Sequence, residues 1–335
     1  MPLVTSGKEI EAFEKVILEF RNLTNEQAYV NVFSKRMMKP VPNRQGEFFG
    51  CDQRLDMLPT VTGLVNQLPR SAQVFDVGAG AGDVVDFALK DSPYGTIVNI
   101  EEPNSILVQA YINRLKNYPN LKNGFVYEGP IQDQRSPKEP QNLILAIHMI
   151  YHLTDFTQKA INPKKDLIDM INYLYGLLAP GGSLLIIYAD LLPSEQHEAV
   201  CSLGYHYFKR MFPNEHFADN LKAIYQARND LLGLNGSIAT HLKEKYPSTN
   251  PTLRSERKES HFFSDSIADM AVLAMATELC PSNKEPFDPA KIEFCFEYLS
   301  HNPEKVFLQI EQENVPQKGM WRGSEPQILS VIVKN

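Results

Sequence analysis

The stretch Val74–Gly82, with the sequence Val-Phe-Asp-Val-Gly-Ala-Gly-Ala-Gly, constrains the fold more than any other part of the chain. Its first four residues are apolar except for Asp76, and the apolar spacing from Val84 to Leu89 is that of a helix. This pattern predicts a buried strand, a tight turn and a helix N-terminus. Glycine permits a sharp turn and the close approach of a ligand, and the first N–H groups of a helix have no partner within it. We therefore expect a ligand at the three glycines of this turn, which are Gly78, Gly80 and Gly82.

Acidic residues narrow the class of ligand. Asp76 lies two residues before Gly78, and Glu101 and Glu102 close the apolar run Thr96–Ile100. An acid at the end of the second strand of a doubly wound sheet is placed to bind two ribose hydroxyls. The spacing Gly-x-Gly-x-Gly also differs from the Gly-x-Gly-x-x-Gly of dinucleotide-binding proteins. Together these features resemble the class I S-adenosylmethionine-dependent methyltransferases, and the turn of some other doubly wound protein is the alternative.

The resemblance implies roles for the residues around the turn. The glycine loop would lie against the methionine part of S-adenosyl-L-methionine, and Asp76 would help to hold its amino group. Glu102 is the preferred ribose acid, because Glu102-Pro103-Asn104 resembles the Glu-Pro-Ser turn of some members, and Glu101 would be a solvated neighbour. Many members place Gly-Asp at the adenine, but this chain has Gly129-Pro130 there. The adenine contact would then come from Gln132, from Asp133 or from a backbone carbonyl, and an unliganded surface turn is the alternative for Asp133.

Composition and charge exclude several classes of partner. The chain has 335 residues, of which 43% are hydrophobic and 22% charged, as is ordinary for a globular protein. Its net charge of −7, without a Lys/Arg cluster interleaved with aromatic residues, argues against a nucleic-acid substrate. Met1–Glu11 lacks the apolar core of a signal peptide, and the longest apolar run, Leu143–Tyr151, is too short to cross a bilayer. We expect a cytoplasmic protein that acts on a small molecule, without nucleic acid or membrane as a partner, and that is a monomer, with a dimer as the alternative.

The cysteines and histidines do not indicate a metal site. The four cysteines are dispersed without a Cys-x-x-Cys pair, which fits a reduced protein without structural zinc. His148 and His152 have the i, i+4 spacing of metal ligands on a helix, but no His-Glu-x-x-His motif accompanies them. We therefore expect no metal, and His148 is either a substrate contact or a buried core histidine.

Alternating helical and strand patterns on either side of the glycine turn predict an α/β fold. A second signature, Ala179-Pro180-Gly181-Gly182, separates an apolar helix from the strand Ser183–Tyr188. We expect a Rossmann-like seven-stranded methyltransferase sheet with helices on both faces and an added helical substrate-binding part. Its last two strands, at 237–242 and 327–334, would form an antiparallel hairpin, and residues 39–50 and 247–258 would be loops.

The same patterns divide the chain into four parts. Residues 1–70 would form an N-terminal helical cap, with one amphipathic helix at 8–20 and a second helix capped by Thr24. Residues 71–200 would form the S-adenosylmethionine-binding α/β core. Residues 201–315 would be a mostly helical substrate-binding elaboration that contains the strand near 237–242, and residues 316–335 would supply the strand that completes the core sheet.

The order of shorter motifs resembles the histamine N-methyltransferase family over most of the chain. These motifs are Thr24-x-x-Gln27, the Gly78 loop, Glu102-Pro103, His148–Asp155, Leu184–Ile187, Ala276–Cys280 and Leu329–Val333. The resemblance implies cofactor contacts at Gly78, Glu102 and Ile147. It also implies transfer of a methyl group from S-adenosyl-L-methionine to a nitrogen of a small amine or imidazole compound.

The substrate positions depart from the pattern of that family. Asn25, with Glu26 beside it, stands where an acid binds the amine, His148 replaces a glutamine that touches the imidazole, and Gln327 replaces an asparagine. We expect Glu26 to anchor a substrate ammonium and His148 to accept a hydrogen bond or a proton, with His152 as a further substrate contact. Because a fold does not fix its acceptor, an O- or protein-directed methyltransferase and a non-catalytic cofactor binder are the alternatives.

Overall fold

The computed structural model describes residues 6–37, 40–43, 46–49, 51–192, 198–276, 279, 283–302, 307–310 and 318–335. The chain forms two compact units, each assembled from segments that are distant in the sequence. Unit 1 comprises Met1–Arg54, Asp190–Tyr225 and Lys258–Gln327, and unit 2 comprises Leu55–Ala189, Gln226–Arg257 and Ile328–Asn335.

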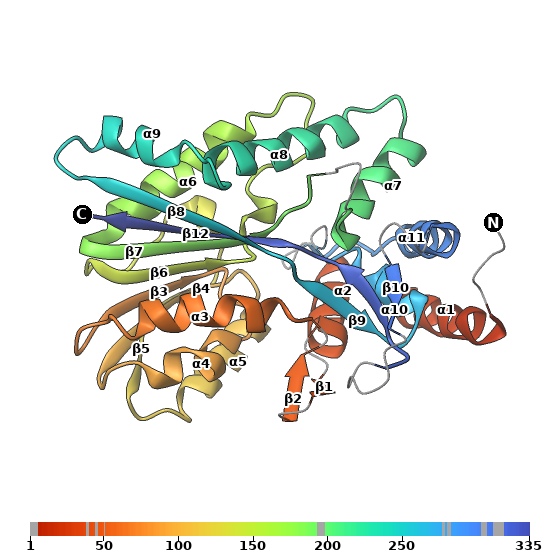
Figure 1. The fold of residues 1–335 in the computed structure, drawn as a ribbon, viewed down its shortest axis with the longest axis horizontal. Coiled ribbons are helices and arrows are strands. Elements are labelled where there is room, and N and C mark those ends of the chain that lie inside the picture. The colour runs from red at the N-terminus through yellow and green to blue at the C-terminus, as the bar shows by residue number, and fades with distance from the viewer. Residues whose placement is uncertain are drawn as a thin grey trace. The chain divides into compact units, whose positions relative to one another are not determined.

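Unit 2 is built on a seven-stranded sheet in the order β5-β4-β3-β6-β7-β12-β8 (Figure 1). The strands are β3 (Gln73–Val77), β4 (Thr96–Glu101), β5 (Leu121–Tyr127), β6 (Gln141–Ile147), β7 (Leu178–Ala189), β8 (Pro251–Lys258) and β12 (Gln327–Lys334). The pairs β3–β4, β3–β6, β4–β5 and β6–β7 are parallel. This order reverses between β3 and β6, which confirms the predicted doubly wound, Rossmann-like sheet and places its crevice at the ends of these strands.

Helices cover both faces of the sheet (Figure 1). On one face lie α3 (Gln53–Val65), α4 (Asp83–Phe87) and α5 (Ser105–Leu115), and on the other lie α6 (Pro163–Leu177), the end of α8 (Phe217–Leu232) and α9 (Ile238–Lys245). Val74 packs on the α3–α5 face and Phe75 on the α6 face, so alternate residues of one strand enter different clusters. Burial on both faces explains why these strands are continuous apolar runs.

The last two strands run antiparallel, as expected, but the predicted position of the first of them is wrong. Lys334 Nζ donates to Leu178 O over 2.7 Å, and Asn250 N donates to Asn335 O over 2.9 Å, so the end of β12 lies beside the starts of β7 and β8. Residues 237–242 instead begin α9, because Ile238 and Leu242 are spaced to bury one helical face.

β12 lies between β7 and β8, and β8 covers residues 251–258 of the predicted loop 247–258. Strand β8 lies at the edge of the sheet, and its polar, mostly half-exposed residues hide the strand pattern. Charged side chains are a common protection of sheet edges. The segment between β8 and β12 enters unit 1, so the two strands do not form a hairpin.

Unit 1 consists mainly of helices with two small antiparallel sheets. Its helices are α1 (Gly7–Phe20), α2 (Asn25–Val32), the π-helix η1 (Phe33–Met37), α7 (Leu203–Met211), the start of α8, α10 (Ile267–Leu273) and α11 (Ala290–His301). Its strands are β1 (Pro40–Asn43), β2 (Gly46–Phe49), β9 (His261–Ser264), β10 (Phe307–Gln309) and β11 (Trp321–Ser324). Thr24 caps α2 through a reciprocal capping box with Gln27, as predicted.

Within the loop predicted at 39–50, the described residues 40–43 and 46–49 form the antiparallel strands β1 and β2, so the prediction is wrong for these residues. Two prolines, Pro40 and Pro42, indicated a loop, yet each keeps its place in the ladder opposite Phe49 and Glu47. A two-stranded ribbon consists of edges only, where proline needs no donor on its outer side.

Candidate functional site

The glycine loop after β3 requires glycine at all three positions. Gly78, Gly80 and Gly82 have φ values of +62°, +55° and +79°, in the left-handed region. A Cβ at Gly78 would lie 2.3 Å from Met149 Cβ, and one at Gly82 would lie 2.7 Å from the Tyr111 ring. A Cβ at Gly80 would meet no atom within 4 Å. Gly80 therefore faces open space, whereas its two neighbours are packed against side chains.

Two glutamates at the end of β4 bind the amides of this loop. Gly78 N donates to Glu101 Oε2, and Gly80 N donates to Glu102 Oε2, both over 2.9 Å. Glu102 also accepts from Asn104 N over 2.9 Å, and Asn104 caps α5. The expectation that Glu101 is solvated is wrong, because it is only 1% exposed. It is the last residue of a strand paired on both sides, and its carboxylate lies against the glycine loop instead of reaching water.

Asp76 lies beneath the loop and is bound by a residue that the sequence analysis did not single out. Its Oδ2 accepts from Tyr111 OH over 2.8 Å, and the two side chains are buried. Tyr111 belongs to the buried face of α5 together with Val108 and Leu115. That helical spacing was visible in the sequence, but the partner of its hydroxyl depends on how α5 packs on β3.

Burial raises the pKa of all three acids at the loop. Burial raises the pKa of Asp76 to about 8. The hydrogen bond from Tyr111 opposes this increase, and the charges of Glu102 and Asp83 add to it. Burial, opposed by the Gly78 amide, also raises the pKa of Glu101 to about 8. The pKa of Glu102 is raised by burial, although backbone amides oppose the shift. Neighbouring acids that resist ionisation favour a cationic ligand over an anionic one.

The segment that follows β6 lies directly beside the glycine loop, since Met149 is the residue that a Cβ at Gly78 would overlap. His148 has a φ of +54° and still donates from its backbone N to Ile187 O over 2.8 Å. Its Nδ1 lies 2.8 Å from the Tyr151 hydroxyl. His148 therefore lies next in sequence to Met149, the residue that packs against Gly78 of the loop.

The candidates for the adenine side have side chains that bind protein groups. Gln132 and Asp133 are exposed on the short helix η3 (Ile131–Asp133), where Gln132 Nε2 donates to His152 O over 3.1 Å. Asp133 accepts from the Tyr127 hydroxyl. The His152 side chain is exposed, and Ile147 is half-buried at the end of β6. These four positions lie in unit 2.

The remaining substrate candidates lie in unit 1 and have structural contacts. Asn25 Nδ2 donates to Glu285 O over 3.0 Å and to Pro286 O over 3.3 Å. Gln327 is fully buried, and its Nε2 donates to Gln53 O over 2.8 Å and to Ser260 Oγ over 3.1 Å. Glu26 is half-buried in the first turn of α2. The Asn25 and Gln327 amide groups thus hold separate segments of unit 1 together.

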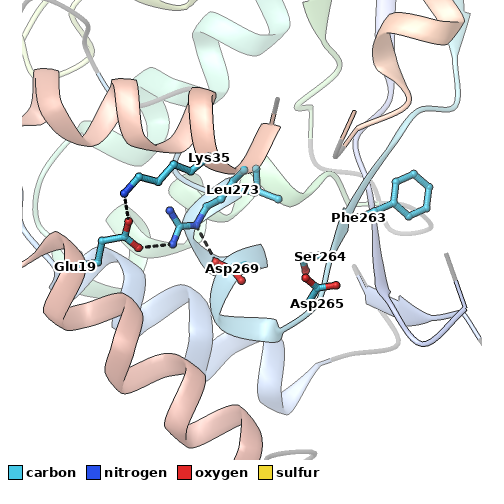
Figure 2. Close-up of a pocket in the computed structure, with 8 residues that line it drawn as sticks. Glu19, Lys35, Phe263, Ser264, Asp265, Asp269 and Leu273 are labelled. Carbon is cyan, nitrogen blue, oxygen red and sulfur yellow. Dashed lines mark hydrogen bonds and ion pairs between the residues drawn. The ribbon is translucent and has the colours of Figure 1, made fainter. Parts of the chain in front are cut away.

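A cavity of about 130 Å³ in unit 1 is lined by charged residues of α1, η1 and α10 (Figure 2). Arg36 is 9% exposed and donates to Glu19 and Asp269, each over 2.8 Å. Figure 2 shows Lys35 reaching the same Glu19 carboxylate. Although burial opposes the change, hydrogen bonds from Arg36, Lys35 and Asn31 lower the pKa of Glu19 to about 2. We interpret this cluster as a structural ion-pair network.

The described part of the chain contains no group of three or more His, Cys, Asp or Glu residues arranged to hold a metal. Cys51, Cys201 and Cys295 are buried and are not joined by disulfides among the described residues, and Cys280 lies outside the described residues. None of the helices among the described residues combines the length and apolar character needed to traverse a bilayer.

No protein-family model and no curated protein sequence matches the chain. Solved structures of similar fold include a cyclopropane synthase from Mycobacterium tuberculosis, with 12% identity over 93% of this chain and 97% of that one and a TM-score of 0.47. A putative sarcosine dimethylglycine methyltransferase from Galdieria sulphuraria has 12% identity over 92% and 97%, with a TM-score of 0.45. A SAM-dependent methyltransferase from Leishmania major has 16% identity over 53% of this chain and 61% of that one, with a TM-score of 0.34. The likeness to the histamine N-methyltransferase family stays a prediction.

Proposed function

We propose that the chain is an S-adenosyl-L-methionine-dependent methyltransferase that methylates a nitrogen of a small amine or imidazole compound. The observation that carries this proposal is the pairing of the glycine-loop amides with two buried carboxylates at the end of β4. A crevice at the switch point of a doubly wound sheet is where such folds bind nucleotides. The raised pKa values of its acids favour a ligand that bears positive charge, as this cofactor does at its sulfonium and amino groups.

The residues present fit this cofactor. Glu102 would bind the ribose hydroxyls, and Asp76 would hold the amino group. The open side of Gly80 would admit the methionine part, because no side-chain atom would be displaced there. Ile147 would contact the cofactor from the end of β6. Gln132 and Asp133 stay candidates for the adenine.

When bound, S-adenosyl-L-methionine supplies a methyl group on a sulfonium, so the carbon–sulfur bond breaks as the carbon–nitrogen bond forms. The protein's contribution is alignment, which is worth several kcal/mol without a covalent intermediate. His148 and Glu26 are the proposed groups for the acceptor, with Asn25, His152 and Gln327 as further candidates. A nitrogen that is already neutral near pH 7 needs no base, and after methylation the cationic product loses a proton to solvent, from the same nitrogen in an amine and from the other ring nitrogen in an imidazole.

Calorimetric titration with S-adenosyl-L-methionine tests the cofactor site. We expect the wild type to bind and Glu102→Gln to raise Kd by about 10- to 100-fold, since a hydrogen bond to a charged group contributes roughly 1.5–3 kcal/mol. Glu244→Gln on exposed α9 is the matched control and should bind like the wild type. Equal affinity of Glu102→Gln and the wild type would remove Glu102 from the site, and no wild-type binding would overturn the proposal.

A turnover screen then tests the acceptor. Amines, imidazoles, phenols and short peptides would be incubated with the cofactor, and the methylated product would be located by mass spectrometry. We expect transfer to a nitrogen of a small compound. Methylation of oxygen or of peptides alone would refute the proposed acceptor class while leaving the cofactor site intact.

A further inference from the structure

The Tyr151 hydroxyl lies between the end of β7 and the His148 ring. Ala189 N donates to Tyr151 OH over 2.8 Å, and His148 Nδ1 lies 2.8 Å from the same oxygen. Tyr151 belongs to the short helix η4 (Ile150–His152), which follows β6 directly. One hydroxyl therefore connects the candidate substrate histidine to the rigid sheet.

The donor and acceptor inventory of these groups restricts where the protons lie. A backbone N–H can only donate, so the Tyr151 oxygen accepts from Ala189 and still has its own proton to give. His148 Nδ1 is within hydrogen-bond distance to take it. We propose that Tyr151 is a positioning residue that donates to His148 Nδ1 and thereby holds the imidazole as the neutral tautomer with its proton on Nε2.

Arg228 supports this direction of the hydrogen bond. Its guanidinium carbon lies 5.1 Å from the centroid of the Tyr151 ring, and the residue is only 5% exposed. Its Nη2 also donates to Ile150 O over 3.3 Å. A cation over the ring face withdraws electron density from the phenol and makes the hydroxyl a better donor. The same buried charge disfavours a second cation at His148.

The backbone of His148 is consistent with a functional constraint on its ring. A φ of +54° is unfavourable for a residue with a Cβ. The hydrogen bond from His148 N to Ile187 O and the contact with Tyr151 keep the residue in this conformation. Such strain is often retained where a side chain must point in one direction.

This inference deepens the proposed function by limiting what His148 can do for the substrate. With Nδ1 occupied and a proton on Nε2, His148 has no ring lone pair left to act as the base, and any hydrogen bond that it gives a substrate must come from the Nε2–H, which is buried. It must then contact a substrate atom other than the nitrogen that is methylated, because the lone pair of that nitrogen has to face the methyl group. We therefore expect acceptors that carry a second hydrogen-bond acceptor and whose nucleophilic nitrogen is neutral near pH 7.

Nuclear magnetic resonance of the full chain with ¹⁵N-labelled histidine tests the tautomer without any substrate. The chain has eight histidines, and His148→Gln identifies the signals of His148. In the wild type at pH 8 we expect an unprotonated Nδ1 and a protonated Nε2. In Tyr151→Phe we expect these signals to move toward a mixture of the two tautomers. A protonated Nδ1 in the wild type, or unchanged signals in Tyr151→Phe, would overturn the proposal.

Tyr175→Phe is the matched control, because it removes a buried tyrosine hydroxyl that binds Thr249 Oγ1, away from His148. It should leave the His148 signals unchanged. Should Tyr151→Phe fail to fold, the wild-type spectrum alone decides. With an acceptor from the screen, Tyr151→Phe should lower kcat by about tenfold at unchanged cofactor Kd. Failed cofactor binding would refute the proposed function and leave the tautomer result standing.

Discussion

Gly80 and Gly82 differ in what surrounds them, although both have a positive φ. We expect Gly82→Ala to destabilise the protein by more than about 2 kcal/mol, because left-handed strain adds to overlap with the Tyr111 ring. Gly80→Ala should cost only the strain, about 1–2 kcal/mol, yet raise the Kd for S-adenosyl-L-methionine at least tenfold. Urea denaturation and calorimetry measure the two effects. Unchanged affinity in Gly80→Ala would show that the cofactor does not approach this glycine.

In strand β4, one buried polar side chain forms hydrogen bonds with both neighbouring parts of the sheet. The register between β4 and β5 shifts between Val98 and Ile100, and the residue at the shift, Asn99, is buried. Its Nδ2 donates to Gln141 Oε1 over 3.0 Å, and its Oδ1 accepts from Phe125 N over 2.9 Å. Asn99 thus provides hydrogen-bond partners for the Phe125 amide and the Gln141 side chain at the place where the β4–β5 pairing is irregular.

We expect Asn99→Leu to lower the free energy of unfolding by about 2–3 kcal/mol, because it leaves buried partners without hydrogen bonds. Urea denaturation of the ligand-free protein measures this loss. Asn123→Leu, at an exposed position of β5, is the control and should stay within about 0.5 kcal/mol of the wild type. Equal stability of Asn99→Leu and the wild type would contradict the role assigned to the Asn99 side chain.

For the molecule as a whole, the acids at the loop couple stability to pH. The pKa of Asp76 and of Glu101 is about 8 in the folded protein, above the ordinary values of 3.8 and 4.5. The folded state then binds more protons than the unfolded state between about pH 4 and 8. The stabilisation that these two acids provide is therefore complete below about pH 4 and is lost as the pH rises through about 8.

Thermal melting at several pH values checks this coupling. We expect Asp76→Asn to lose less stability between pH 6 and 8.5 than the wild type, since the titrating group is gone. Bound S-adenosyl-L-methionine should raise the wild-type Tm more at pH 8.5 than at pH 6, because its positive charge stabilises the ionised acids. Parallel pH curves for Asp76→Asn and the wild type would show that Asp76 ionises as it does in water.

Local chemistry alone was enough to predict much of unit 2. Alternation of buried strands with amphipathic helices and the glycine turn depend on neighbours in sequence, so the doubly wound sheet could be predicted. The segment Ala179–Gly182, predicted to precede the strand, instead lies inside β7, which begins at Leu178. The same holds for the Thr24 cap and for the placement of Asp76 and Glu102 at the strand ends. Periodicity and turn chemistry act over a few residues, and the sequence contains them in full.

Other features were decided only by packing between distant segments. Glu101 is buried because β3 and β5 flank its strand, and β8 is a strand because β12 completes its hydrogen bonds. The Tyr151 contact with Ala189 and the Tyr111 contact with Asp76 join elements whose spacing in sequence predicts no contact. Hydrogen-bond partners at this range follow from how helices and strands pack in three dimensions, which no local pattern specifies.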